Sequence, residues 1–131
     1  MSYALDTNVL ARYIVQDDKE QAKKAAKIIE ALQPDAPAFI SCIVLCELNW
    51  VLQSGYKVSK EERIVALERI LTAAVFAIER LEICIKALRL YKAGQGDYSD
   101  YLIQQIAKQE GYATVLTFDK NAQKSEGFQS P

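Results

Sequence analysis

The chain has 131 residues, half of them hydrophobic, and a formal net charge of −1. This composition excludes global disorder and argues against a broad electrostatic attraction to nucleic acid, although local basic patches remain compatible with it. The chain contains no histidine, which excludes histidine-based nucleophile systems, histidine acid–base catalysis and most transition-metal sites. An enzyme of this composition has to use carboxylates, lysine, tyrosine, hydroxyl groups or a metal ion held by oxygen ligands.

The length predicts a single domain over residues 1–131. No apolar run reaches the ~18–20 residues that span a bilayer, and the N-terminus has no basic patch followed by an apolar core, so we expect a cytoplasmic protein with no membrane partner. The odd cysteine count predicts no disulfide framework. We expect Cys42, Cys46 and Cys84 to be small hydrophobic residues in a reducing compartment.

Short apolar segments alternate with amphipathic ones along the chain. In chain order the pattern predicts a strand at 2–5, helices at 8–16 and 19–32, a strand at 38–40, helices at 42–54 and 60–74, a short strand at 75–78, helices at 82–92 and 98–110, a strand at 113–117 and an edge strand around Phe128 in the tail 119–131. This alternation predicts an α/β fold, a three-layer α/β/α sandwich of Rossmann-like type around a short parallel sheet of about four to five strands.

The acid with the most apolar surroundings is Glu47. On a helix its neighbours three and four positions away are Ile43, Val44, Trp50 and Val51. A carboxylate buried on such a face is costly unless it is paired, protonated or bound to a metal. The alternative is a structural glutamate hydrogen-bonded to a serine, a threonine or the backbone.

Other acids stand where predicted strands end or helices begin. Asp6 and Asp119 each follow an apolar strand, and the carboxyl ends of parallel strands form the edge where open α/β sheets bind ligands. Asp97 and Asp100 lie three positions apart at a helix start, so they share a face. Helix capping is an alternative explanation for each of these acids, since acids stabilise helix N-termini.

Several carboxylates at one edge would repel one another, and there is no histidine to neutralise them. A hard divalent cation, Mg²⁺ or Mn²⁺, resolves the repulsion because it prefers oxygen ligands and can bridge carboxylates to a phosphate. The pattern therefore predicts phosphodiester hydrolysis by a metal-activated water.

Four motifs in order resemble those of the PIN-domain nucleases, most closely the VapC-type toxin ribonucleases. They are Asp6-Thr7-Asn8, Ser41 with Glu47-Leu48, Gly96-Asp97-Tyr98-Ser99-Asp100, and Thr117-Phe118-Asp119. The resemblance covers essentially the whole chain. It implies a PIN-like fold and an Mg²⁺- or Mn²⁺-dependent endoribonuclease that cleaves single-stranded or loop RNA. It also implies a homodimer and an antitoxin partner in a type II toxin–antitoxin pair.

The resemblance assigns roles residue by residue. It implies a catalytic, metal-binding quartet of Asp6, Glu47, Asp100 and Asp119, with Asp97 as a further metal ligand. The polar residues that it implies as supports of the carboxylates or metal waters are Thr7, Asn8, Ser41 and Thr117. The chain departs from the family at Tyr101, Gln104 and Gln105, where smaller residues are usual, and at Asn121, where many relatives carry another acid.

Two basic residues adjoin the acidic motifs. Arg12 lies one turn after Asn8, and Lys120 directly follows Asp119. We expect both to contact RNA phosphates, the alternative being surface charge that confers solubility.

Two other functions remain open from the residues. One is phosphoryl transfer through an aspartyl phosphate, or a phosphatase, with Asp6 as nucleophile. Hydrolases of that kind need a second aspartate two positions later, where this chain has Asn8. The other is a non-catalytic binding module on a PIN fold.

Overall fold

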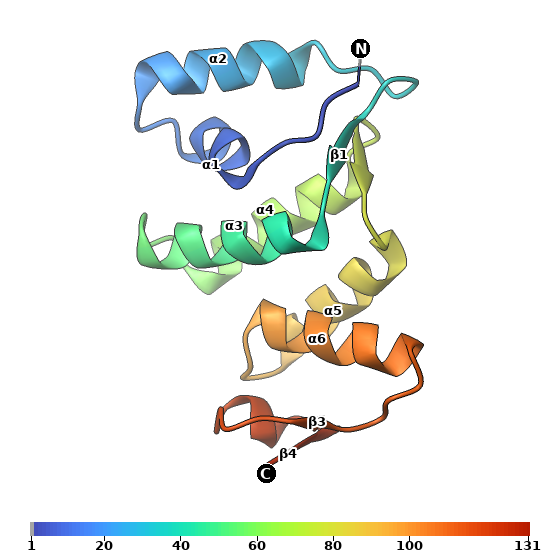
Figure 1. Ribbon diagram of the computed structural model, residues 1–131. Helices are drawn as coiled ribbons and strands as arrows, with labels where there is room; N and C mark the ends of the chain where they lie inside the picture. Colours follow the sequence, from blue (N-terminus) through green and yellow to red (C-terminus); the bar gives the residue numbers. More distant parts are fainter. Residues whose placement is uncertain (1) are drawn as a thin grey trace. The chain divides into compact units, whose positions relative to one another are not determined.

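A computed structural model describes residues 2–131 (Figure 1). The chain forms two compact units, a first that ends at Glu79 and a second, Arg80–Pro131. The boundary falls between a strand and the helix that follows it. No helix within residues 2–131 has both the length and the apolar composition needed to cross a membrane.

The first unit contains four helices and two strands among its described residues. They are α1 (Thr7–Val15), α2 (Lys19–Glu30), β1 (Ala38–Ile40), α3 (Cys42–Ser54), α4 (Lys60–Thr72) and β2 (Phe76–Ile78). Each helix begins at a polar side chain that accepts a backbone N–H: Asp6 caps α1, Asp18 caps α2, Ser41 caps α3 and Ser59 caps α4. The predicted strand 38–40 and helix 42–54 are confirmed at both ends.

Parallel pairing joins β1 to β2, with Ala38 opposite Phe76 and Ile40 opposite Ile78. The predicted strand at 2–5 is reduced to an isolated parallel bridge between Ala4 and Phe39. Two backbone hydrogen bonds form this bridge, from Leu5 N–H to the Phe39 carbonyl at 3.0 Å and from Phe39 N–H to the Tyr3 carbonyl at 2.8 Å. The α/β class and the parallel pairing are therefore confirmed in this unit, with very short strands.

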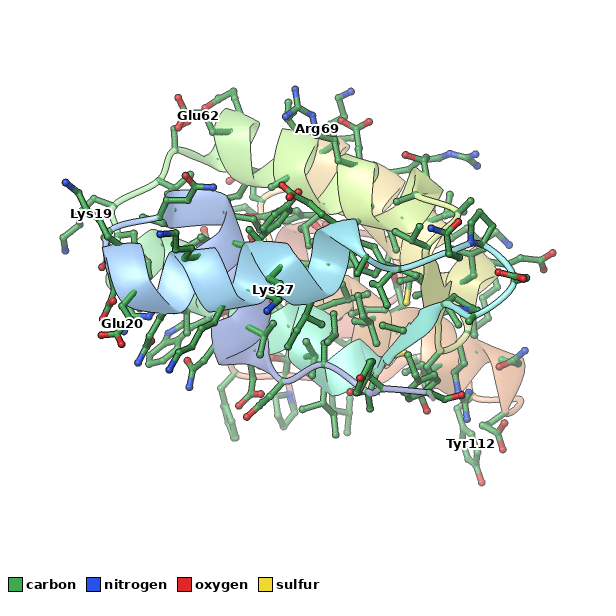
Figure 2. The ribbon with its side chains drawn as sticks, turned by 90° about the horizontal axis from the view of Figure 1, so that it is seen from above. Lys19, Glu20, Lys27, Glu62, Arg69 and Tyr112 are labelled. Atoms are coloured by element: carbon green, nitrogen blue, oxygen red, sulfur yellow. The ribbon has the colours of Figure 1, made fainter. Side chains whose placement is uncertain are left out.

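Helix α2 shows how the amphipathic pattern translates into packing. Its buried face consists of Ala22, Ala25 and Ile29, while Lys19 and Lys27 are exposed, as Figure 2 shows. Small alanines on the buried face let α2 lie close to α1, against which it packs.

The second unit contains α5 (Leu81–Ala93), α6 (Tyr98–Gln109), β3 (Val115–Leu116), the 3₁₀ turn η1 (Ala122–Lys124) and β4 (Phe128–Gln129). Strands β3 and β4 are parallel, with Val115 opposite Phe128. The predicted strand 113–117 is shorter than expected but its neighbour at Phe128 is confirmed. The α6–β3 connection turns through Gly111, whose φ of +97° favours glycine.

The core of the second unit includes three buried tyrosines, Tyr91, Tyr98 and Tyr101, and Phe128. The Tyr98 hydroxyl donates to the carbonyl of Cys84 at 3.0 Å, which ties α6 to α5. The Tyr101 hydroxyl accepts the N–H of Gly96 at 3.1 Å, and its ring meets Phe128 edge-on at 5.9 Å. The phenols of Tyr98 and Tyr101 thus have polar partners, as buried tyrosines require.

A buried polar pair lies between α3 and α4 in the first unit. Arg63 is 5% exposed, and its Nε donates to Asn49 Oδ1 at 3.0 Å while one of its terminal nitrogens donates to the carbonyl of Val58. A buried guanidinium is stable only while such acceptors remain in place.

We predict that Asn49→Leu lowers the free energy of unfolding by about 2 kcal/mol, because it removes an acceptor from a buried charge. Gln53→Leu, at an exposed position one turn further along the same helix, should change it by less than about 0.5 kcal/mol. Urea denaturation followed by far-ultraviolet circular dichroism measures both. Equal effects of the two substitutions would contradict a stabilising role of the Arg63–Asn49 pair.

Candidate active site

Two of the predicted catalytic acids are linked through Thr7 in the first unit. Asp6 is the N-cap of α1, and its Oδ1 accepts the N–H of Thr7 at 2.8 Å. The hydroxyl of Thr7 donates to Oε1 of Glu47 at 2.9 Å. The threonine is 6% exposed, so the packing of α1 against α3 fixes the direction of its hydroxyl. Residues forty positions apart thus form one polar cluster.

The expectation that Glu47 lies buried among apolar side chains is wrong. The residue is exposed, and two of its helical neighbours, Ile43 and Trp50, are 70% and 65% exposed. Helix α3 buries the opposite stripe, which includes Leu45 and Leu48. The hydrogen bond from Thr7 agrees with the alternative of a structural glutamate bonded to a threonine. Because the carboxylate is exposed, it is also accessible to a ligand.

The other predicted polar residues of this unit have simpler roles. The Ser41 hydroxyl accepts the N–H of Val44 at 3.3 Å and caps α3. Asn8 is exposed on the first turn of α1. The sequence interpretation missed Glu79, whose Oε1 accepts the N–H of Cys42 at 2.9 Å at the same helix start. Like Asp6 and Asp119, it is an acid directly after an apolar segment, and this signal could have identified it.

In the second unit, two acids act electrostatically on a third, Asp100. Burial raises the pKa of Asp100; the hydrogen bond that its Oδ2 accepts from the N–H of Asp97 opposes this shift, and the negative charges of Asp119 and Asp97 raise the pKa further. The structure therefore brings Asp97, Asp100 and Asp119 into one acidic cluster. Asp97 is at the same time the N-cap of α6, so the capping explanation holds for it as well.

The carboxylate of Asp119 is fixed from one side. Its Oδ1 accepts the N–H groups of Asn121 and Ala122, both at 2.9 Å. The Thr117 hydroxyl accepts the N–H of Asp119 at 3.1 Å. Among the described residues no hydrogen bond reaches Oδ2 of Asp119, which leaves this oxygen available to a ligand. At position 121 the chain contributes a backbone N–H to the cluster and no further acid.

The bulky residues after Asp100 contribute to packing within the second unit. Tyr101 is 1% exposed. The Gln104 amide donates to the carbonyl of Glu126 at 2.7 Å, and Gln105 is buried. The bulky side chains of Tyr101 and Gln104 thus contact the chain at and next to β4.

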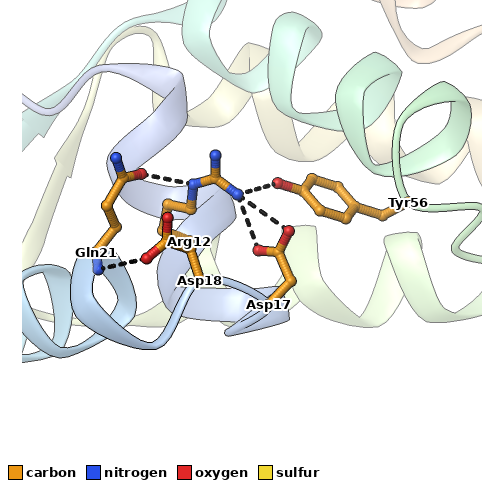
Figure 3. Close-up of polar contacts among 5 residues, drawn as sticks. All are labelled: Arg12, Asp17, Asp18, Gln21 and Tyr56. Carbon is orange, nitrogen blue, oxygen red and sulfur yellow. Dashed lines mark hydrogen bonds and ion pairs between the residues drawn. The ribbon is translucent and has the colours of Figure 1, made fainter.

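The two predicted RNA contacts differ in their surroundings. Arg12 donates to both carboxylate oxygens of Asp17, at 2.9 and 3.1 Å, to Oε1 of Gln21 and to the hydroxyl of Tyr56 (Figure 3). The hydrogen bond with Asp17 raises the pKa of Arg12 above its ordinary value. This guanidinium joins α1, α2 and the α3–α4 loop. Lys120 is exposed next to Asp119.

Two of the three cysteines match the expectation of small, buried hydrophobic residues. Cys42 and Cys84 are buried, whereas Cys46 is only partly buried. Burial, then the nearby Cys42 and Glu47, raise the pKa of Cys46 to about 11. At neutral pH the thiol stays protonated, which disfavours both nucleophilic attack and metal binding.

The donor chemistry fits a hard cation. The two clusters offer carboxylate oxygens, and the crowding of negative charge around Asp100 is what a divalent cation relieves. Within residues 2–131, however, no three acidic or cysteine side chains converge closely enough to form a ready metal site.

Comparison with known proteins covers nearly the whole chain. The family model of the PIN domain matches residues 3–126. A protein named VapC ribonuclease from Aquifex aeolicus (strain VF5) is 30% identical over 121 residues, which cover 92% of this chain and 89% of that protein. The family model and the VapC relative each cover nearly the whole chain. We conclude that the chain belongs to the PIN domain family, among its VapC-type members.

Proposed function

We propose that the chain is a metal-dependent endoribonuclease that cleaves single-stranded or loop RNA. The observation that carries the proposal is the acidic cluster of the second unit, in which Asp97 and Asp119 both act electrostatically on Asp100. Repulsion between carboxylates destabilises the folded protein, and proteins carry such repulsion where the acids have a catalytic role. The name of the Aquifex relative supports RNA as the substrate.

In this proposal Asp6, Glu47, Asp100 and Asp119 are the catalytic acids, and Asp97 is a further ligand. They would hold Mg²⁺ or Mn²⁺, which supplies positive charge at the phosphate and acidifies a bound water. The chain's own contribution is orientation: Thr7 holds one oxygen of Glu47, and two N–H groups hold one oxygen of Asp119. Each carboxylate thereby keeps a fixed direction before substrate arrives.

The biological role is inferred from the name of the same relative. We propose that the protein is the toxin of a type II toxin–antitoxin pair, acts in the cytoplasm as a homodimer and is inhibited by a cognate antitoxin. A gene for a small DNA-binding protein next to this one would support the pairing.

The alternatives give different results in the same assays. An aspartyl-phosphate enzyme would hydrolyse phosphomonoesters and become labelled at Asp6, whereas a binding module would retain RNA without cleaving it. Incubation with a fluorescent single-stranded RNA and with a phosphomonoester separates the three functions.

We predict that the purified protein cleaves single-stranded RNA in Mg²⁺ or Mn²⁺ and stops in EDTA. Asp100→Asn and Asp119→Asn should each lower the rate by about 100-fold or more, since each removes a ligand charge and no packing. Circular dichroism should report an unchanged fold. Cleavage that persists undiminished in EDTA would exclude the metal mechanism.

We predict that Thr7→Val lowers the cleavage rate by about 10- to 100-fold, because it removes the donor that orients Glu47 while it keeps the side-chain volume. Thr7→Ser, which retains the hydroxyl, should restore most of the rate. Single-turnover kinetics with saturating enzyme measure both. If the serine variant is as impaired as the valine variant, the hydroxyl has no orienting role.

We predict that Lys120→Ala weakens RNA binding and lowers its salt dependence by roughly 0.7 in log–log slope, the value of one phosphate contact on a single strand. Arg12→Ala should produce a similar loss only if its guanidinium leaves Asp17 on binding. Fluorescence anisotropy against salt concentration measures both variants. An unchanged slope in each would exclude these residues from the RNA path.

A further inference from the structure

A groove between α5 and α6 lies entirely within the second unit. Its volume is about 510 Å³, and its basic lining residues are Lys86, Arg89 and Lys108. Glu82 is the one acid among the lining residues. The groove is therefore electropositive, in a chain whose net charge is −1. None of the roles proposed above uses it.

Amide groups add directional donors to this charge. Gln105 also lines the groove, although the residue is only 9% exposed. Its Nε2 makes only a long contact of 3.4 Å with Oε1 of Gln104, so it retains capacity for a stronger acceptor. Gln109 lines the groove as well, and its Oε1 accepts a hydrogen bond from Arg80 at 3.0 Å. A further cation is thus held beside the groove.

We propose that the α5–α6 groove binds the phosphate backbone of single-stranded RNA at a distance from the cleaved bond. This inference rests on the proposed ribonuclease function and names a second contact surface for the same substrate. Guanidinium and ammonium groups with amide donors are the side chains that recognise phosphate oxygens. Ile83 and Ile85, which are half-buried in the lining, offer apolar surface to ribose and base.

Helix α6 connects this groove to the acidic cluster. Asp100 is in its first turn and Lys108 near its end, eight positions later, which corresponds to about 12 Å along the axis at ~1.5 Å per residue. One rigid element thus carries an acidic residue of the proposed site and a basic residue of the groove. A short stretch of single-stranded RNA can reach from one to the other.

The groove variant is K86Q/R89Q/K108Q, which removes three charges and keeps side chains of similar length. We express it in the non-cleaving Asp100→Asn background and measure the binding of a labelled 12-nucleotide RNA by anisotropy between low and high salt. We expect affinity near ~100 mM salt to fall about tenfold and the log–log salt slope to fall by about 2, which is three contacts at ~0.7 each.

The matched control is K19Q/K23Q/K57Q in the same background. It removes three exposed charges of the first unit that do not line the α5–α6 groove. If the control weakens binding as much as the groove variant, the effect is general electrostatics and the inference is overturned. Competition by polyglutamate at equal charge would also overturn it, because the groove would then prefer an acidic protein segment.

Cleavage assays with Asp100 intact separate this inference from the proposed function. We expect the groove variant to cleave a minimal RNA at the parental rate and a longer RNA with a raised KM. If the parent cleaves RNA and the groove variant matches it on both substrates, the groove inference fails and the nuclease function stands. If the parent neither binds nor cleaves RNA, both fail.

Discussion

Four acids of this chain are kept in place by backbone N–H groups at the starts of helices. Asp6 caps α1, Asp97 caps α6, and Glu79 accepts an N–H at the start of α3. Asp119 accepts two N–H groups where η1 begins. A helix N-terminus favours negative charge, so it stabilises carboxylates placed there. In a protein without histidine, these N–H groups orient acids within each unit.

Capping and ligand binding are therefore compatible roles for the same residue. A cap uses one carboxylate oxygen, as Oδ1 of Asp119 shows, and leaves the other for a ligand. The two interpretations of the acids that the sequence left open do not exclude each other. Asp100 shows that capping does not remove the repulsion between the acids. Burial and then its acidic neighbours raise the pKa of Asp100, although the hydrogen bond from the N–H of Asp97 lowers it.

Local patterns predicted the helices well, because caps such as Ser41 and stop signals such as Gly55 act within a few residues. Strand lengths were overestimated at 2–5 and 113–117, since apolar composition does not report where a partner strand ends. The burial of Glu47 was wrong because α3 has apolar residues on both faces and only packing decides which face is covered. The Thr7–Glu47 bond and the basic α5–α6 groove depend on tertiary contacts that spacing alone does not reveal.

The central claim is that the carboxylates around Asp100 hold a divalent cation, and calorimetric titration with Mn²⁺ tests it most directly, without RNA. We expect the parent protein to bind Mn²⁺ and both Asp100→Asn and Asp119→Asn to lose most of the affinity, while Glu110→Gln, an exposed acid at the end of α6, binds as the parent does. Equal Mn²⁺ affinity in all four proteins would contradict the claim.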